Sequence, residues 1–170
     1  MKGGKKAQKK DKKIWVLVLA LLVVVCGSVL FVGAVSGWFN GPVMAEIDSE
    51  FYCSSKCYLE LKDISVDEYN EMTDAGKSFV VVVDQGGCTT ADRIKEYAER
   101  YSNKRFFEVF KIMFSDIKKT NLGEKVKFYP SVAVISKGKV ITWLRADSDE
   151  DSAAYNSYED FEKWMNRFVR

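Results

Sequence analysis

The sequence predicts an α/β domain with a mixed five-stranded sheet flanked by helices, preceded by one transmembrane helix. After residue 58, segments with the spacing of strands alternate with segments with the spacing of helices. Helices join the earlier strands, which favours parallel strands, whereas Ser136-Lys137-Gly138 joins the last two as an antiparallel hairpin. An uncharged run of 23 residues precedes all of them.

Composition and charge exclude several classes of protein. The chain has 170 residues, no histidine and a net charge of +2. Without histidine there is no Ser-His-Asp triad, no Cys-His nucleophile pair and no zinc site with a histidine ligand. Residues 1–13 form a basic arm with seven lysines and one aspartate, a net charge of +6, so the rest of the chain sums to −4.

Residues 14–36 are predicted to form the transmembrane helix, since 19 of these 23 residues are apolar and none is charged. A helix of this length spans about 34 Å, enough for a hydrocarbon core of about 30 Å. The basic arm before it predicts a cytoplasmic N-terminus and an extracytoplasmic body, by the positive-inside rule. We therefore expect a single-pass signal-anchor whose partner is membrane lipid. The anchor explains the lysines, so we expect no nucleic-acid partner.

Two processing events are alternatives to a retained anchor. Cleavage after Ala45 would remove the anchor, because Val43-Met44-Ala45 offers small residues for a peptidase. Lipidation of Cys26 is the other alternative, but the residues before it match a lipobox only loosely. We favour the anchor, with Cys26 as a buried apolar residue, because signal peptides have apolar regions of roughly 7–15 residues.

Residues 37–58 are predicted to be a juxtamembrane connector, and residues 59–170 a folded domain. Apolar residues at every second position predict a strand at 58–64, and Ser65 with Glu68 forms the capping box of a following helix. That helix is expected to run from residue 66 to 75 and to end at Gly76. The apolar run at 79–83 is typical of a strand buried on both faces.

The second half of the domain continues the alternation. After Gly86-Gly87, a helix begins near Cys88, and polar residues at 116–125 predict a short helix or turn. Apolar runs predict strands at 106–114, 131–135 and 139–144. Helical spacing of apolar residues marks the helix after Cys88 (Ala91, Ile94, Ala98, Tyr101) and a C-terminal helix (Tyr158, Phe161, Met165, Phe168).

Residues 59–169, about two thirds of the chain, resemble the thioredoxin-fold family. A valine-rich strand leads into Cys88 at the start of a helix, and Phe128-Tyr129-Pro130 precedes a strand and hairpin. The resemblance implies a cis peptide bond before Pro130, and a groove in which Tyr129 and Pro130 face Cys88. Thr89 and Thr90 are expected to line the same groove. Protein or peptide clients are the partners that such a groove implies.

Cys88 is the candidate catalytic residue. A cysteine at a helix N-terminus meets unpaired amides and the positive end of the helix dipole, which favour the thiolate. The family's motif is Cys-x-x-Cys, but this chain has Ala91 in the second position, and alanine provides no thiol to resolve a mixed disulfide. Asp84 and Asp92 add nearby negative charge that opposes ionisation of Cys88. Ordinary dithiol reductase chemistry is therefore not expected.

Cys53 and Cys57 stand before the first strand of the domain. That strand runs parallel to the strand that leads to Cys88, so its start should lie at the opposite pole of the sheet. We predict that neither cysteine reaches Cys88. A disulfide between them in an oxidising compartment is one interpretation, and two free thiols are the other.

Asp147, Asp149 and Asp151 alternate as in a calcium-binding loop. An EF-hand requires glycine and an acidic residue where this chain has Ser152 and Tyr158. We interpret the segment as a solvated acidic loop near the active-site end of the fold, where its charge would influence the choice of partner. The sequence predicts no metal and no other cofactor.

The function predicted from these features is thiol-disulfide exchange on exported proteins through Cys88, by a membrane-anchored extracytoplasmic thioredoxin-like protein. The enzymatic part of this prediction depends on a monothiol, since no resolving cysteine is present. The alternative is a non-catalytic thioredoxin-fold binding module of an envelope or export assembly. A third hypothesis, peroxide chemistry at Cys88, lacks a recognisable arrangement of supporting Arg and Thr residues.

Peptide mapping without reductant tests the cysteine assignment. We expect a cross-link between the peptides that contain Cys53 and Cys57, together with a Cys88 that iodoacetamide alkylates. A cross-link from Cys88 to either of the other two would contradict the predicted layout of the sheet.

Overall fold

The computed structural model describes residues 42–54 and 58–170 of the chain. Pro42–Arg170 form one compact unit. The predicted arm and the predicted transmembrane segment at 14–36 lie outside the described residues, and so does Cys57. In the described ranges, none of the helices combines the length and the apolar character needed to cross a membrane.

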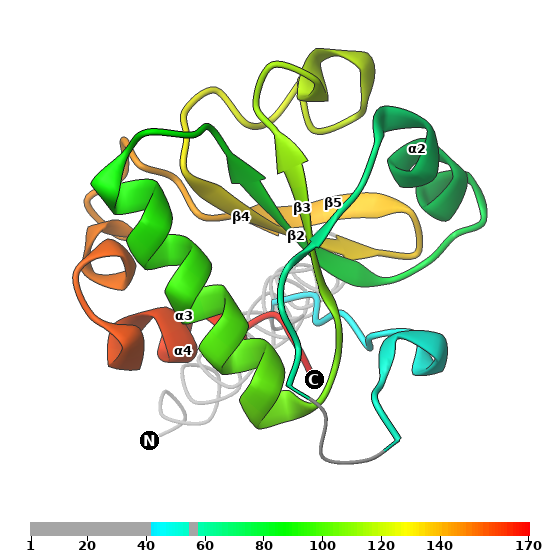
Figure 1. Cartoon of the computed structure of the whole chain (residues 1–170), viewed down its shortest axis with the longest axis horizontal. Helices are drawn as coiled ribbons and strands as arrows, with labels where there is room; N and C mark the ends of the chain where they lie inside the picture. The colour runs from blue at the N-terminus through cyan, green and yellow to red at the C-terminus, as the bar shows by residue number, and fades with distance from the viewer. Residues whose placement is uncertain (1–41, 55–57) are drawn as a thin grey trace, which may run out of the picture. The chain divides into compact units, whose positions relative to one another are not determined.

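The domain is built on a mixed five-stranded sheet with the order β1-β3-β2-β4-β5 (Figure 1). Strands β1 and β2 run parallel to β3, whereas β4 runs antiparallel to β2, and β5 to β4. This arrangement confirms the predicted mixture of helix-linked parallel strands and a final hairpin. The strands are β1 (Lys62–Asp63), β2 (Phe79–Asp84), β3 (Val109–Met113), β4 (Ser131–Ser136) and β5 (Lys139–Trp143).

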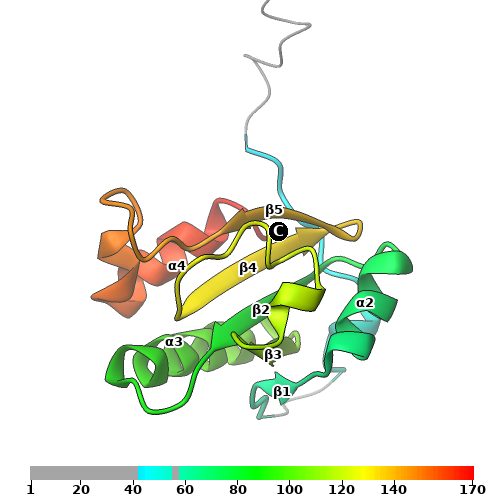
Figure 2. The ribbon, with the colours of Figure 1, turned by 90° about the horizontal axis from the view of Figure 1, so that it is seen from above.

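Helices flank both faces of the sheet. Figure 2 shows α3 and α4 on one side and α2 on the other. Right-handed crossovers account for the opposite sides of α2 and α3, which join the parallel strands. The α-helices of the described residues are α2 (Val66–Asp74), α3 (Thr89–Arg105) and α4 (Tyr158–Asn166), with 3₁₀ turns η1 (Ser49–Phe51), η2 (Ile117–Lys119) and η3 (Ser152–Tyr155).

Local sequence signals account for several element boundaries. The capping box at the start of α2 is confirmed, because Ser65 Oγ accepts a hydrogen bond from the Glu68 amide (3.2 Å) and Glu68 Oε2 accepts one from the Ser65 amide (2.7 Å). Strand β3 starts later than the predicted residue 106. Phe106 instead ends α3 in a left-handed conformation (φ 59°), which turns the chain before β3 begins.

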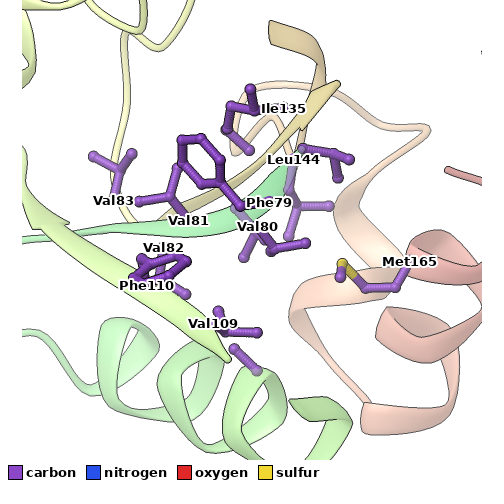
Figure 3. Packing of buried hydrophobic residues seen from close by; sticks show 14 of the residues in the cluster. Phe79, Val80, Val81, Val82, Val83, Val109, Phe110, Ile135, Leu144 and Met165 are labelled. Atoms are coloured by element: carbon purple, nitrogen blue, oxygen red, sulfur yellow. The ribbon is translucent and has the colours of Figure 1, made fainter. Parts of the chain in front are cut away.

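The core is centred on β2, in which all six residues are buried. Figure 3 shows its valines on both faces of the strand, with Met165 of α4 pointing toward the strand. Phe51 packs edge-to-face on Phe79 and Phe110, with ring centroids 6.2 and 5.1 Å apart. Ala45 and Ile47 are also buried. Part of the segment predicted as a connector therefore belongs to the folded domain.

The hairpin between β4 and β5 requires glycine at residue 138. Lys137 and Gly138 both have positive φ (51° and 74°), the geometry of a two-residue type I′ turn. A Cβ at residue 138 would also collide with the Thr73 carbonyl oxygen of α2. Gly138→Ala should therefore lower the free energy of unfolding by about 1–3 kcal/mol in urea titrations.

Gly86→Ala is the matched control for this glycine. Residue 86 does not have a positive φ, and a Cβ there meets no atom within 4 Å. Its substitution should leave stability within about 0.5 kcal/mol of the parent. Equal effects at the two glycines would contradict the close approach between the hairpin and α2.

Candidate functional site

Cys88 lies at the junction of β2 and α3. Strand β2 ends at Asp84, and Gly87 with φ +85° provides the turn that leads into the helix. Cys88 is the N-cap residue of α3, half-buried and not disulfide-bonded. The buried central strand thus holds the thiol at the edge of the sheet, where solvent reaches it.

The start of α3 lowers the pKa of the Cys88 thiol. The side chain does not form a capping hydrogen bond of normal geometry, but the amides of Ala91 and Thr90 stabilise the thiolate and lower its pKa. The Thr90 hydroxyl adds to the effect, whereas partial desolvation and the Asp92 carboxylate oppose it. The amides prevail because they act directly on the sulfur, while Asp92 is exposed to solvent.

The charge of Asp84 has its own partner. Its buried carboxylate lies 3.3 Å from Lys95 Nζ, and Lys95 also pairs with Asp92 at 2.9 Å. Of the two aspartates expected to oppose thiolate formation, Asp92 is the one whose carboxylate raises the pKa of Cys88.

A second thiol is not available in the first turn of α3. Ala91 occupies the position of the missing cysteine and is fully buried. Cys53 is disulfide-bonded, and its amide donates to the Phe106 carbonyl (2.8 Å), directly after the last residue of α3. With 17 residues, α3 separates the two cysteines by about 25 Å. Since Cys57 lies outside the described residues, its pairing with Cys53 stays a prediction.

Cys88 and the Tyr129-Pro130 segment share one hollow. The hollow has a volume of about 400 Å³, and its walls include Cys88 and Thr90 of α3 together with Tyr129 and Pro130. The peptide bond between Tyr129 and Pro130 is cis. Thr89, which we expected in the same groove, is exposed and is not among the wall residues.

Besides α3 and the Tyr129-Pro130 segment, the segment before α4 also lines the hollow, and the sequence analysis did not assign it to the site. Figure 1 shows the start of α3 beside the orange segment that precedes α4. This segment and α3 add further residues to the hollow: Arg93, Ala146, Ser152, Tyr155 and Asn156. Arg93 is near Cys88 because both belong to the start of α3, whereas the other four residues approach Cys88 only through the packing of α3 against the segment before α4.

Tyr155 fixes the loop that carries Pro130. Its buried hydroxyl lies 2.8 Å from the Pro130 carbonyl oxygen and 3.1 Å from that of Leu144, and donates to this pair. Burial raises the pKa of Tyr155, so the hydroxyl stays protonated as the donor that these carbonyls require. The same residue accepts a hydrogen bond from Arg93 through its main-chain oxygen (3.4 Å).

The acidic loop differs from the solvated segment that the sequence predicted. Asp151 is buried, and its Oδ2 accepts hydrogen bonds from the Arg145 amide (3.0 Å) and from Arg145 Nε (3.3 Å). Its neighbours Asp149 and Glu150 are exposed. Asp151 therefore closes the loop that leads from β5 to the hollow.

Solved thioredoxin structures are similar to this domain at low sequence identity, whereas no protein-family model and no curated protein matches the chain. Oxidised thioredoxin from Plasmodium falciparum is 18% identical, with a TM-score of 0.45, over 60% of this chain and 98% of its own. Reduced thioredoxin pre-protein from Schistosoma mansoni is 17% identical, with a TM-score of 0.47, over 65% and 97%. A mutant thioredoxin from Halobacterium salinarum is 12% identical, with a TM-score of 0.44, over 66% and 96%.

The fold class follows from the strands themselves. A mixed sheet in the order β1-β3-β2-β4-β5, with helices on both faces, fits a thioredoxin-like α/β fold.

The electrostatics of Cys88 can be tested by alkylation with iodoacetamide as a function of pH. Because the pKa is lowered, the thiolate should predominate at lower pH than in a free cysteine, whose pKa is about 8.5. Thr90→Val should raise the midpoint, since it removes a hydrogen bond to the thiolate. Asp92→Asn should lower it, since it removes an opposing charge.

Glu96→Gln is the control, because Glu96 lies on the same helix and is not among the groups that shift the pKa of Cys88. A Cys88 midpoint at or above that of a free cysteine would refute the stabilisation by the α3 amides.

Proposed function

We propose that this protein is a membrane-anchored, extracytoplasmic thioredoxin-fold protein that exchanges thiols and disulfides of exported proteins through Cys88. The observation that carries the proposal is a half-buried thiol with a lowered pKa in the same hollow as Tyr129 and Pro130. A thiolate is the nucleophile in thiol-disulfide exchange, and a hollow beside it gives room for a second sulfur.

The chemistry requires a monothiol cycle. The Cys88 thiolate attacks one sulfur of a client disulfide, a mixed disulfide forms, and the other client sulfur leaves as a thiolate. Ala91 provides no thiol for an internal second step. The mixed disulfide therefore persists until an external thiolate attacks it, breaks the bond to Cys88 and forms a new disulfide. Each step breaks one disulfide bond and forms another, so the cycle needs no further oxidant.

The start of the folded unit supports retention of the predicted anchor. Ala45 is fully buried, and its amide donates to the Phe168 carbonyl (2.6 Å), while its carbonyl accepts from the Arg170 amide (3.0 Å). Cleavage after Ala45 would remove this residue from the core and leave the C-terminal segment without its pairing. Retention keeps the domain joined to residues 14–36, which we propose cross the membrane.

A binding module without catalysis is the second candidate. It is favoured by exposed apolar side chains at the hollow, because Tyr129, which lines it, is 39% exposed and the preceding residue Phe128 is 53% exposed. Tyr129 also packs against Phe114 in a tilted arrangement, with ring centroids 4.9 Å apart. Side chains of this kind suit a polypeptide partner held without covalent chemistry.

Substitutions at Cys88 and Ala91 separate the two candidates. In cells lysed with an alkylating agent, the parent protein should form mixed disulfides with exported proteins, visible on gels without reductant. Cys88→Ser should abolish these adducts. Ala91→Cys should shorten their lifetime at least tenfold, because the introduced thiol lies one helical turn from Cys88 and attacks within the same molecule.

Thr89→Ala is the control for this experiment, since Thr89 is exposed outside the hollow. Partners that remain bound to the Cys88→Ser variant, with no adducts in the parent, would favour the binding module instead.

A further inference from the structure

We propose that the folded domain has a surface of its own for anionic lipid headgroups, located where the described chain begins. The inference rests on one part of the proposed function, the membrane anchor at residues 14–36. It goes beyond that function because it assigns a lipid contact to residues of the folded domain, and with it an orientation of Cys88 relative to the lipid.

Three segments meet around Ala45 to form this surface. The Ala45 amide donates to the Phe168 carbonyl after α4 (2.6 Å), and the preceding residue, Met44, lines a hollow together with Lys137 of the β4–β5 hairpin. Figure 2 shows the cyan start of the domain, β5 and the C-terminus on one side, with the start of α3 away from them. We call this the entry surface and define it by five exposed residues: Val43, Met44, Lys137, Lys139 and Arg167.

The entry surface carries apolar side chains that the core does not cover. Val43 and Met44 are 65% and 42% exposed. Trp143 of β5 and Phe168 are partly buried, and they line a further hollow together with Arg167. Tryptophan is enriched at the boundary between membrane and water, where one part of the ring is apolar and the other is wet. This combination of side chains suits the headgroup region of a bilayer.

The cations of the entry surface are not neutralised by the domain. Lys137, Lys139 and Arg167 form no ion pair with a carboxylate in residues 42–54 or 58–170. The Arg167 guanidinium instead lies over the Phe168 ring, 5.2 Å from its centroid, and keeps its charge. Residues 14–170 have a net charge of −4. The positive charge of this surface is therefore opposite to that of the domain as a whole.

The carboxylates nearest to these cations leave an excess of positive charge. Glu46 is the exposed carboxylate in the segment that contains Met44. Glu150 and Asp151 follow the other end of β5, where each lies 3.3 Å from Arg145. The entry surface thus has three cations against one carboxylate. Anionic lipids attract clusters of lysine and arginine of this kind to their phosphate groups.

The length of the connecting chain keeps the entry surface close to the lipid. Five residues, 37–41, separate the predicted transmembrane segment from Pro42. Even when fully extended, a chain of this length spans no more than about 20 Å. Because the connection is so short, the lipid has a high effective concentration at this surface, and a few cations are enough for docking.

The edge of β5 favours lipid over a second copy of this chain. Strand β5 ends the sheet, and an edge strand can pair with a strand of another molecule. The register with β4 shifts between Val134 and Ile135, so Ile141 is an extra residue that interrupts the row of edge hydrogen-bonding groups. Exposed Lys139 also opposes pairing with a second strand. A fluid lipid surface requires no strand register and attracts the same lysine.

Docking through the entry surface orients Cys88 away from the lipid. The hairpin with Lys137 lies beside the start of β2, because Phe79 pairs with Ile135. Cys88 follows the opposite end of β2, at the start of α3. The hollow around Cys88 then stays open to exported proteins.

The test uses the full chain in nanodiscs, either of phosphatidylcholine alone or of equal parts phosphatidylcholine and phosphatidylglycerol. Lysines are acetylated with an N-hydroxysuccinimide ester, and the rates are read by site-resolved mass spectrometry. The measured quantity is the rate at Lys139 divided by the rate at Lys125, an exposed lysine in the loop before β4. We expect this ratio to be at least about threefold lower in the anionic discs, and added salt to restore it.

Arg167→Glu should return the ratio to its value in the neutral discs, because it replaces an attraction by a repulsion. Arg167→Lys should keep the protection, since attraction to a charged surface does not require a guanidinium. Lys118→Glu is the matched control, because it changes the net charge by the same amount. Lys118 is exposed in η2, which follows β3 at the end of the sheet opposite the hairpin, so its variant should keep the protection.

The possible failures are distinguishable. An equal ratio in the two kinds of disc, or a protection that survives Arg167→Glu, would overturn the entry surface while the chain remains in the discs. Protection in neutral discs that rises with the number of chains per disc would assign the surface to a second copy and overturn the lipid partner. A chain that does not co-elute with the discs would overturn the proposed anchor, and this inference with it.

Discussion

The complete burial of β2 is the constraint on which the rest of the domain depends. Its six residues are shielded on both faces and pair with β3 on one side and β4 on the other. A strand held from four directions has no freedom to shift its register, since a slip of one residue would exchange its two faces. The turn after Asp84 therefore starts α3 at a defined place, which fixes the position of Cys88.

The second constraint is the tie between Tyr155 and the cis-proline segment. The buried phenol of Tyr155 in η3 is hydrogen-bonded to two carbonyl oxygens, one in the loop before β4 and one directly after β5. Because the hydroxyl stays protonated, the connection does not depend on pH in the physiological range. The walls of the hollow are thus held by hydrogen bonds between segments that are distant in the sequence, and not only by apolar contact.

The chemistry that we propose depends on the amides at the start of α3, which stabilise a thiolate, and on the lack of a second cysteine in its first turn. Its first amides favour a thiolate at Cys88, whereas buried Ala91 gives no second sulfur. A stabilised thiolate is a good leaving group as well as a nucleophile, so the same amides would assist both formation and release of a mixed disulfide. A thiol of this kind needs a second thiol from solution to complete its cycle.

The sequence alone determined the features that short-range physics controls. Three features depend only on residues close together in the sequence, so they could be predicted without a structure. They are the capping box of Ser65, the buried strand at 79–83 and the hairpin at 136–138. The placement of Cys88 at a helix start is of the same kind. Strand boundaries were predicted less well, since β1 is shorter and β3 starts later than expected. The pairing partner limits β1, and the end of α3 decides where β3 begins.

Only the tertiary structure decided which distant residues meet. Tyr155 reaches the hollow because the segment before α4 packs against α3, where its carbonyl accepts a hydrogen bond from Arg93, more than sixty positions away. The inclusion of Ala45 in the core likewise depends on its pairing with Phe168 and Arg170 of the C-terminal segment. Such contacts leave no periodic trace in the sequence, since any surface segment can carry an arginine, a tyrosine or an aspartate. The roles of these residues follow only from the tertiary structure that brings them together.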